Sequence, residues 1–312
     1  MNDDMVLLII SIVAASMRMA VPIGFAAIGG AISEKSGIVA LGLEGYMIVG
    51  AFFSVVGASM FQSASIGLLF AMLAGGIFAG IYALMCIRFG ANQTVGGLGM
   101  NIIAPGLVAI LMVVLYGNKG KSVVVPRLGE VTLPIIKDIP ILGKLFSGHT
   151  ILFYLLILVA ILSWIVFYKT PTGIRLRANG TNPEVINALG LSSDRIQYVA
   201  VVISGILAGM GGAYLTIGQL GFYSLDMIAG RGFIAIAVFV FARWNPAGCF
   251  WAALLFGFTQ AIQMRLQTLG LPSQLIRMIP YIATLLVLIN IRQSKTKNKT
   301  IKKPRKHLAQ KI

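Results

Sequence analysis

The acidic side chains of this sequence are few, and their positions limit the chemistry that the chain can perform. Only nine of its 312 residues are Asp or Glu. Two of them, Glu44 and Asp226, fall inside or at the start of long apolar runs. A carrier driven by a proton or sodium gradient usually needs carboxylates inside the membrane or ion sites at broken helices. We therefore expect the energy for any transport to come from outside this chain. The acidic residues are Asp3, Asp4, Glu34, Glu44, Glu130, Asp138, Glu184, Asp194 and Asp226.

The sequence also lacks the residue sets of an enzyme. Residues 117–122 end in the Gly-Lys-Ser of a phosphate-binding loop, but Leu115 stands where that loop needs its first Gly. The two histidines, His149 and His307, form no Ser/His/Asp set in the sequence. Cys86 and Cys249 show no metal or disulfide spacing. We expect no catalytic activity, no metal and no cofactor bound by this chain itself.

Helix-capping residues are concentrated in one polar stretch, residues 169–195. Its opening Lys-Thr-Pro-Thr-Gly ends the preceding apolar run. Asn182 is a favourable N-cap, Pro183 suits the first helical position, and Glu184 suits the positive end of the helix dipole. Gly190 is a typical C-terminal stop. The stretch predicts a short amphipathic helix of about two turns along one membrane face. It is suited to contact a soluble motor, and the alternative is an ordinary connecting helix.

Composition places these groups in an integral membrane protein. Apolar residues make up 58% of the chain and charged residues 11%, whereas a soluble domain has about 25% charged residues. A span needs about 20 mostly apolar residues. We predict an all-α, polytopic membrane protein with about nine (8–10) transmembrane helices, some of them broken. The candidate spans are 5–32, 38–61, 64–87, 93–116, 149–168, 196–217, 226–242, 247–269 and 273–291.

The first apolar run contains two residues that disfavour a simple span. Arg18 at the centre of a transmembrane helix costs about 2.5–3.5 kcal/mol on insertion scales. Pro22 removes a backbone donor from the helix. The two residues together predict an interfacial stretch followed by a broken helix in this run.

The basic residues predict the topology. Nine of the 25 Lys and Arg residues lie between positions 292 and 311, directly after the last apolar run. We interpret 1–291 as the transmembrane domain and 292–312 as a basic cytoplasmic tail held near anionic lipid. RNA or partner binding by the tail is the alternative, but the charge distribution argues against nucleic acid as the partner of the chain. Counting spans backwards places 169–195 inside, 117–148 outside and the N-terminus outside.

Several blocks of the sequence carry a resemblance to a known family over about residues 20–290. The sequence resembles the permease subunits of bacterial ABC importers, in the family shared by branched-chain amino acid and simple-sugar permeases. Within that family it is most similar to the purine-nucleoside type that works with a lipoprotein receptor. Thr181 and Ala40 depart from the pattern, where Glu and Asn are usual. The blocks are ISEKSG at 32–37, GLEGYM at 42–47, GTNP at 180–183, SGILAGMGGAY at 204–214, AGRGFIA at 229–235 and RWNP at 243–246.

The resemblance implies a function and partners. The chain would carry purine nucleosides across the bacterial cytoplasmic membrane by alternating access. It would work with ATP-binding subunits that hold ATP and Mg, a second related permease and an extracellular substrate-binding lipoprotein. Residues 174–190 would be the coupling segment that docks into the ATPase. Simple sugars or branched-chain amino acids are alternative solutes, and an ion-coupled secondary carrier is the alternative of another class. The implied coupling residues are Arg175, Arg177, Gly180, Asn182, Pro183, Glu184 and Gly190.

Five residues are candidates for the solute path, each with a simpler alternative. Glu44 follows a predicted helix break and could bind a ribose hydroxyl or a base amine; the alternative is pairing with Arg18 or solvation. Asn92, Gln93 and Asn101 could line a path for a neutral solute, or could bond neighbouring helices. Phe233 could stack on a base, or could simply pack. These alternatives stay open at the level of sequence.

Overall fold

The computed structural model describes residues 3–118, 120–131 and 148–267. Within this part of the chain, seven helices are long and apolar enough to cross a membrane, so the predicted all-α, polytopic fold class is confirmed. The predicted ninth span, 273–291, and the tail, 292–312, lie outside the described residues. The long helices are α1 (Asp3–Ser36), α2 (Leu43–Phe61), α3 (Ala64–Ala83) with η1 (Leu84–Arg88), α4 (Gln93–Tyr116), α6 (Ile151–Lys169), α9 (Ser193–Ala213) with η2 (Tyr214–Leu220), and α11 (Pro246–Gln267).

The remaining elements are short. α7 (Pro171–Thr181) and α8 (Pro183–Ala188) follow α6, and α10 (Arg231–Phe241) precedes α11. β1 (Glu130–Val131) pairs in antiparallel orientation with β2 (His149–Thr150). The two segments η1 and η2 have π-helical winding and continue α3 and α9. Nearly all of these elements belong to one compact unit, Met1–Ile262; a second unit begins at Gln263 inside α11.

The prediction of a broken first helix is wrong. α1 runs without interruption through Arg18 and Pro22. Proline is tolerated inside a transmembrane helix because neighbouring helices and local adjustment satisfy the freed backbone groups. Arg18 lines a polar pocket beside α1, which supplies the polar surroundings that its charge requires. The sequence shows the charge and the proline but not the neighbours that accommodate them.

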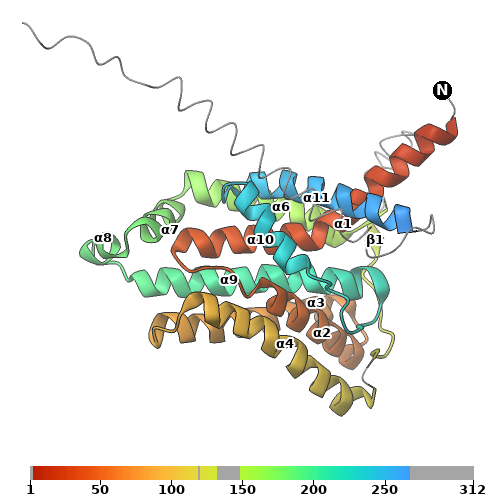
Figure 1. Ribbon diagram of the computed structural model, residues 1–312, viewed down its shortest axis with the longest axis horizontal. Coiled ribbons are helices and arrows are strands. Elements are labelled where there is room, and N and C mark those ends of the chain that lie inside the picture. The colour runs from red at the N-terminus through yellow and green to blue at the C-terminus, as the bar shows by residue number, and fades with distance from the viewer. Residues whose placement is uncertain (1–2, 119, 132–147, 268–312) are drawn as a thin grey trace, which may run out of the picture. The chain divides into compact units, whose positions relative to one another are not determined.

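The prediction of a helical span at 226–242 is also wrong in part. Only the 11 residues of α10 are helical there. Residues 221–230 are irregular because their backbone turns repeatedly: Gly221, Asp226, Ala229 and Gly230 all have positive φ. Irregular backbone at membrane depth is tolerated where protein buries it, and Ile228 is buried in the core. α10 is therefore a half-helix, inclined to its longer neighbours (Figure 1).

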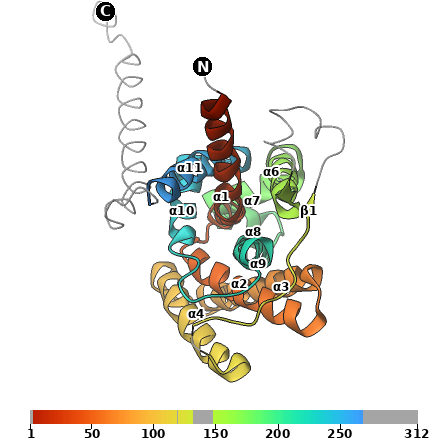
Figure 2. The ribbon, with the colours of Figure 1, turned by 90° about the vertical axis from the view of Figure 1, so that its right-hand side faces the viewer.

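α9 forms the centre of the bundle, with α1 on one side of it and α2 and α3 on the other (Figure 2). Its glycines permit this. A Cβ on Gly209 would meet the backbone of α3, and one on Gly205 would overlap Gly75 of the same helix. A Cβ on Gly50 of α2 would in turn overlap the backbone of Gly209. The small residues thus let three helices approach closely, as is common in membrane proteins.

The two ends of the bundle differ. α7 and α8 lie at one end, next to the C-terminus of α1, whereas β1 lies at the other (Figure 1). Residues 121–131 are extended and run beside η2 and the turn after it, for example through the bond from Leu128 N to Ile217 O at 2.8 Å. Residues 121–131 and α7–α8 therefore lie at opposite ends of the bundle, and the membrane side that each end faces stays a prediction. Residues 132–147 lie outside the described part.

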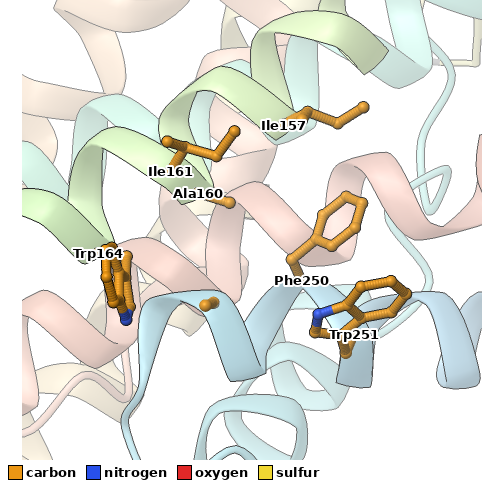
Figure 3. Close-up of a pocket in the computed structure, with 7 residues that line it drawn as sticks. Ile157, Ala160, Ile161, Trp164, Phe250 and Trp251 are labelled. Carbon is orange, nitrogen blue, oxygen red and sulfur yellow. The ribbon is translucent and has the colours of Figure 1, made fainter.

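Two apolar grooves mark the outer surface of the bundle. One of about 270 Å³ lies between α6 and α11, where Trp164 and Trp251 stand on its rim (Figure 3). Another of about 380 Å³ lies against α2, α3 and α4. Both are lined almost wholly by carbon, so they suit lipid chains and offer little to a polar solute.

Candidate functional site

The polar stretch after α6 folds as two short helices that meet at Asn182. Thr170 caps α7, its hydroxyl accepting a hydrogen bond from Gly173 N at 3.4 Å, and Pro171 occupies the first position. Asn182 caps α8 in the same way, accepting from Glu184 N at 3.0 Å. Gly190 has a φ of +75°, which ends the segment. The predicted helix from Pro183 is confirmed; α7 was not predicted, although Thr-Pro carries the same start signal as Asn-Pro.

α7 is fastened to the end of α1. Asn179 is fully buried, and its Nδ2 donates to Ser36 O at 2.9 Å. At Gly180 a Cβ would overlap the carbonyl oxygen of Lys35, so only glycine permits this approach. We call these contacts of Asn179 and Gly180 with α1 the α1–α7 joint. The joint thus ties the end of α7 to the end of α1 through a buried hydrogen bond and a close backbone approach.

α8 presents an exposed, partly apolar surface. Val185 is 50% exposed and Leu189 is 70% exposed. Pro183 and Glu184 are exposed beside them, and Ile186 is the buried residue that holds the helix to the bundle. We call Pro183, Glu184, Val185 and Leu189 the α8 face. The α8 face thus combines exposed aliphatic and polar side chains on a short, capped helix at one end of the bundle.

The two arginines of α7 have different surroundings. Arg177 lies over the ring of Tyr168 at 5.1 Å, and its Nε donates to Gly173 O at 3.4 Å. Arg175 is exposed and lines a groove of about 410 Å³ with Arg195 and apolar residues of α7 and α9. Arg177 therefore stabilises the α6–α7 corner, whereas the Arg175 side chain is exposed.

Polar side chains hold the connector between α1 and α2 inside the bundle. This connector, residues 37–42, has no helical structure. Gln93 Oε1 accepts from Val39 N at 2.9 Å. Asn101 donates to Leu41 O at 2.7 Å and accepts from Gly45 N at 2.9 Å. For Gln93 and Asn101 the structure supports the alternative, bonding between neighbouring elements.

Asn92 and Tyr82 complete this arrangement. Asn92 is the N-cap of α4 and accepts from Thr94 N and Val95 N at 3.0 and 3.2 Å. The Tyr82 hydroxyl lies 2.7 Å from Val39 O and 3.0 Å from Gln93 O. Tyr82 was missed at the level of sequence, since a tyrosine in an apolar run carries no signal of the backbone groups that it will meet.

Glu44 binds the start of the half-helix α10. Its carboxylate accepts from Gly230 N at 2.9 Å and from Gly232 N at 2.6 Å, and the side chain is 9% exposed. A carboxylate is favoured at a helix N-terminus, where backbone donors are unpaired and the dipole is positive. A Cβ on Gly232 would overlap the backbone of Glu44. Glu44 thus binds backbone groups of α10 instead of Arg18, and joins two elements distant in sequence.

The residues around Glu44 fix the same junction. Arg231 donates from its Nη1 to Met227 O at 2.9 Å and Ile228 O at 3.1 Å, which holds the turn before α10. Phe233, two residues after Arg231, is 46% exposed. The other four candidates for the solute path bind backbone groups of the protein, whereas the exposed ring of Phe233 leaves stacking on a base as a prediction.

A comparison with protein families matches residues 12–288 to the branched-chain amino acid transport system permease component. The match covers most of the described helices and the blocks that suggested the resemblance. The chain belongs to this permease family.

Curated relatives of the permease match along most of its length. A nucleoside ABC transporter permease protein, NupC of Lactococcus lactis subsp. cremoris, is 38% identical over 89% of this chain and 90% of its own. A guanosine ABC transporter permease protein, NupQ of Bacillus subtilis, is 37% identical over 91% and 93%. A putative glucose ABC transporter permease protein, TsgC13 of Haloferax volcanii, is 30% identical over 82% and 78%. No solved structure matches the permease.

Proposed function

We propose that this permease carries nucleosides, in the first place purine nucleosides, as the membrane subunit of an ATP-driven importer. The observation that carries the proposal is the α8 face, fastened through the α1–α7 joint to a helix that crosses the bundle. The names of two relatives, which specify nucleoside and guanosine, support the solute. The end with α7 and α8 is cytoplasmic in this proposal, and the N-terminus is outside.

The coupling path begins at the α8 face. Val185 and Leu189 insert into a groove of an ATP-binding subunit, and Glu184 and Arg175 form the polar rim of this contact. ATP and Mg reside on that subunit. When the ATP-binding subunits close, α8 moves, and the joint transmits the movement to Lys35 and Ser36 at the end of α1. The two conformations can exchange populations only because the motor binds them with different affinity.

The second half of the path runs through Glu44. The connector 37–42 links α1 to α2, and Glu44 at the start of α2 holds α10 through two backbone donors. A movement of α1 therefore reaches a half-helix at membrane depth, with Phe233 on its exposed side. Discontinuous helices of this kind are common at the transport sites of membrane carriers. Alternating access follows from the tilt of α10 with α2.

The importer also needs other proteins. A second related permease would complete the membrane part, and an extracellular lipoprotein would deliver the solute. Glucose or another simple sugar is the second candidate solute, because TsgC13, a putative glucose permease, is 30% identical. An ion-coupled carrier would require an intramembrane acid. Of the two candidates, Glu44 accepts backbone bonds with both oxygens, and Asp226 lies in the irregular turn before α10.

The test compares uptake of labelled guanosine in cells with and without this gene, with adenosine, ribose, glucose and leucine as competitors. We expect gene-dependent uptake that adenosine suppresses, that stops on ATP depletion and that persists when the ion gradients collapse. A Leu189→Asp variant should abolish uptake while the protein remains in the membrane at wild-type amounts. Ala188→Ser, a neighbouring exposed position, is the matched control. Uptake that survives ATP depletion would reject the proposal.

A further inference from the structure

A polar pocket of about 500 Å³ lies at the end of the bundle opposite α7 and α8. Small-molecule sites have volumes of roughly 300–1,000 Å³, so the pocket has the size of a ligand site. Three parts of the chain line it: α1, the outer segment with β1 and β2, and the π-helical η2. The lining residues are Arg18, Arg127, Leu128, Gly129, Glu130, Gly148, Thr150, Tyr214, Gly218 and Gln219.

Arg18 belongs to the apolar helix α1, whose candidate span runs from Ile10 to Ser36. Its side chain is exposed at the pocket instead of being packed in the core. An ionisable residue within a candidate span is expensive in lipid and usually marks a functional site. The exposed guanidinium is therefore available to a ligand of the pocket.

The other polar residues of the pocket are held in position by η2. Arg127 donates to Gln219 O at 3.2 Å, and Thr150 donates to Gly218 O at 3.2 Å. The side-chain amide of Gln219 donates to the Tyr214 hydroxyl at 3.3 Å. π-Helical turns often occur at functional sites, because they shift carbonyl groups out of the regular pattern. Here the shifted carbonyls order the pocket wall.

The charges of the lining residues limit the ligand. Arg18 and Arg127 are cationic, and Glu130 is the one carboxylate among the described lining residues. The net positive charge disfavours cations, and the carboxylate disfavours a phosphate dianion. A guanidinium donates to hydroxyl oxygens, and a carboxylate accepts from two neighbouring hydroxyls. An uncharged solute with vicinal hydroxyl groups can accept from the guanidinium groups and donate to the carboxylate.

We propose that this pocket binds the sugar part of the solute when it enters the permease, with Arg18 donating to and Glu130 accepting from its hydroxyl groups. The inference rests on the proposed function for the direction of entry. It adds a binding site that is separate from Phe233 and from the coupling path. The sugar hydroxyls, rather than the base, are then the part of a nucleoside that the outer pocket recognises.

The test measures equilibrium binding to the assembled importer in nanodiscs, without the external receptor. The probes are guanosine, 2′,3′-dideoxyguanosine and guanosine 5′-monophosphate. We expect the wild type to bind guanosine at least about tenfold more tightly than the dideoxy analogue, a factor that corresponds to about 1.4 kcal/mol, because the analogue lacks both hydroxyl groups that bind the charged side chains. Arg18→Gln and Glu130→Gln should each reduce this preference to about twofold. Arg18→Gln also removes the cost of inserting a charge, so poor insertion does not explain its effect.

Controls separate the remaining outcomes. Arg243→Gln, an exposed cation outside the pocket, should keep the preference for guanosine. Tighter binding of the monophosphate than of guanosine would overturn the proposal in favour of an anion site. A second measurement adds the unliganded external receptor to the same nanodiscs. Variants that keep the preference for guanosine but lose affinity for this receptor would overturn the proposal in favour of a protein contact. Absence of guanosine uptake in cells, with the binding preference intact, would reject the proposed function and leave the pocket assignment standing.

Discussion

The α7–α8 end and the Glu44 junction are both made by capping of helix starts, but they are built at very different sequence distances. At the α7–α8 end, Asn182 caps its own helix, accepting from Glu184 two residues away. At the junction, Glu44 accepts from Gly230 and Gly232, which are 186 and 188 residues away. Local caps shape a segment, whereas a long-range cap ties two elements together. We therefore expect changes at the junction to cost stability, and changes at the α7–α8 end to cost coupling.

The largest effect is expected at Glu44. Glu44→Ala leaves two buried backbone donors without an acceptor and releases the start of α10 from α2. Hydrogen bonds to charged groups contribute about 1.5–3 kcal/mol each. We therefore expect the free energy of unfolding to fall by about 3 kcal/mol or more and uptake to be lost. Thermal unfolding of the purified permease in nanodiscs measures the first effect. Glu184→Ala, at an exposed position of α8, should have the thermal stability of the wild type. An equal loss of stability in both variants would contradict the distinction between long-range and local caps.

A smaller loss of stability but a clear loss of coupling is expected at the α1–α7 joint. Gly180→Ala places a methyl group against the carbonyl of Lys35, and relieving such an overlap costs about 1–3 kcal/mol. We expect guanosine uptake to fall about tenfold, while the assembled importer keeps its basal ATP hydrolysis because the α8 face is unchanged. Gly106→Ala on α4, where a Cβ meets open space, is the control. Parallel loss of uptake and basal hydrolysis would show that the joint does not separate docking from transmission.

Asn101 tests whether the polar groups beside the connector touch the solute. Asn101→Ala removes the bonds to Leu41 O and Gly45 N, and we expect a cost of about 1–2 kcal/mol in stability. A positioning role predicts a lower maximal uptake rate with an unchanged KM for guanosine. A raised KM for guanosine with unchanged stability would instead indicate that Asn101 contacts the solute.

The comparison also explains which features could be predicted from the sequence. The apolar runs predicted the long helices, and Asn182-Pro183 predicted the start of α8, because both signals are local. The half-helix α10 was missed, since its boundary depends on positive-φ residues from Gly221 to Gly230 and on a distant carboxylate. The role of Asn179 depends on a contact with Ser36, 143 residues away, and α1 continues through Arg18 and Pro22 because its neighbours accommodate them.

The smallest effect is expected from two N-cap asparagines at different places in the bundle. Asn92 accepts two backbone bonds at the start of α4, and Asn182 accepts one at the start of α8. Replacing either with Ala should cost about 1 kcal/mol in stability. Asn92→Ala should leave uptake within about twofold of the wild type, because α4 packs at the edge of the bundle. Asn182→Ala should reduce uptake further at the same stability, because the lost cap loosens the α8 face that meets the motor. Equal uptake in the two variants would remove the reason for assigning coupling to α8 rather than to the joint alone.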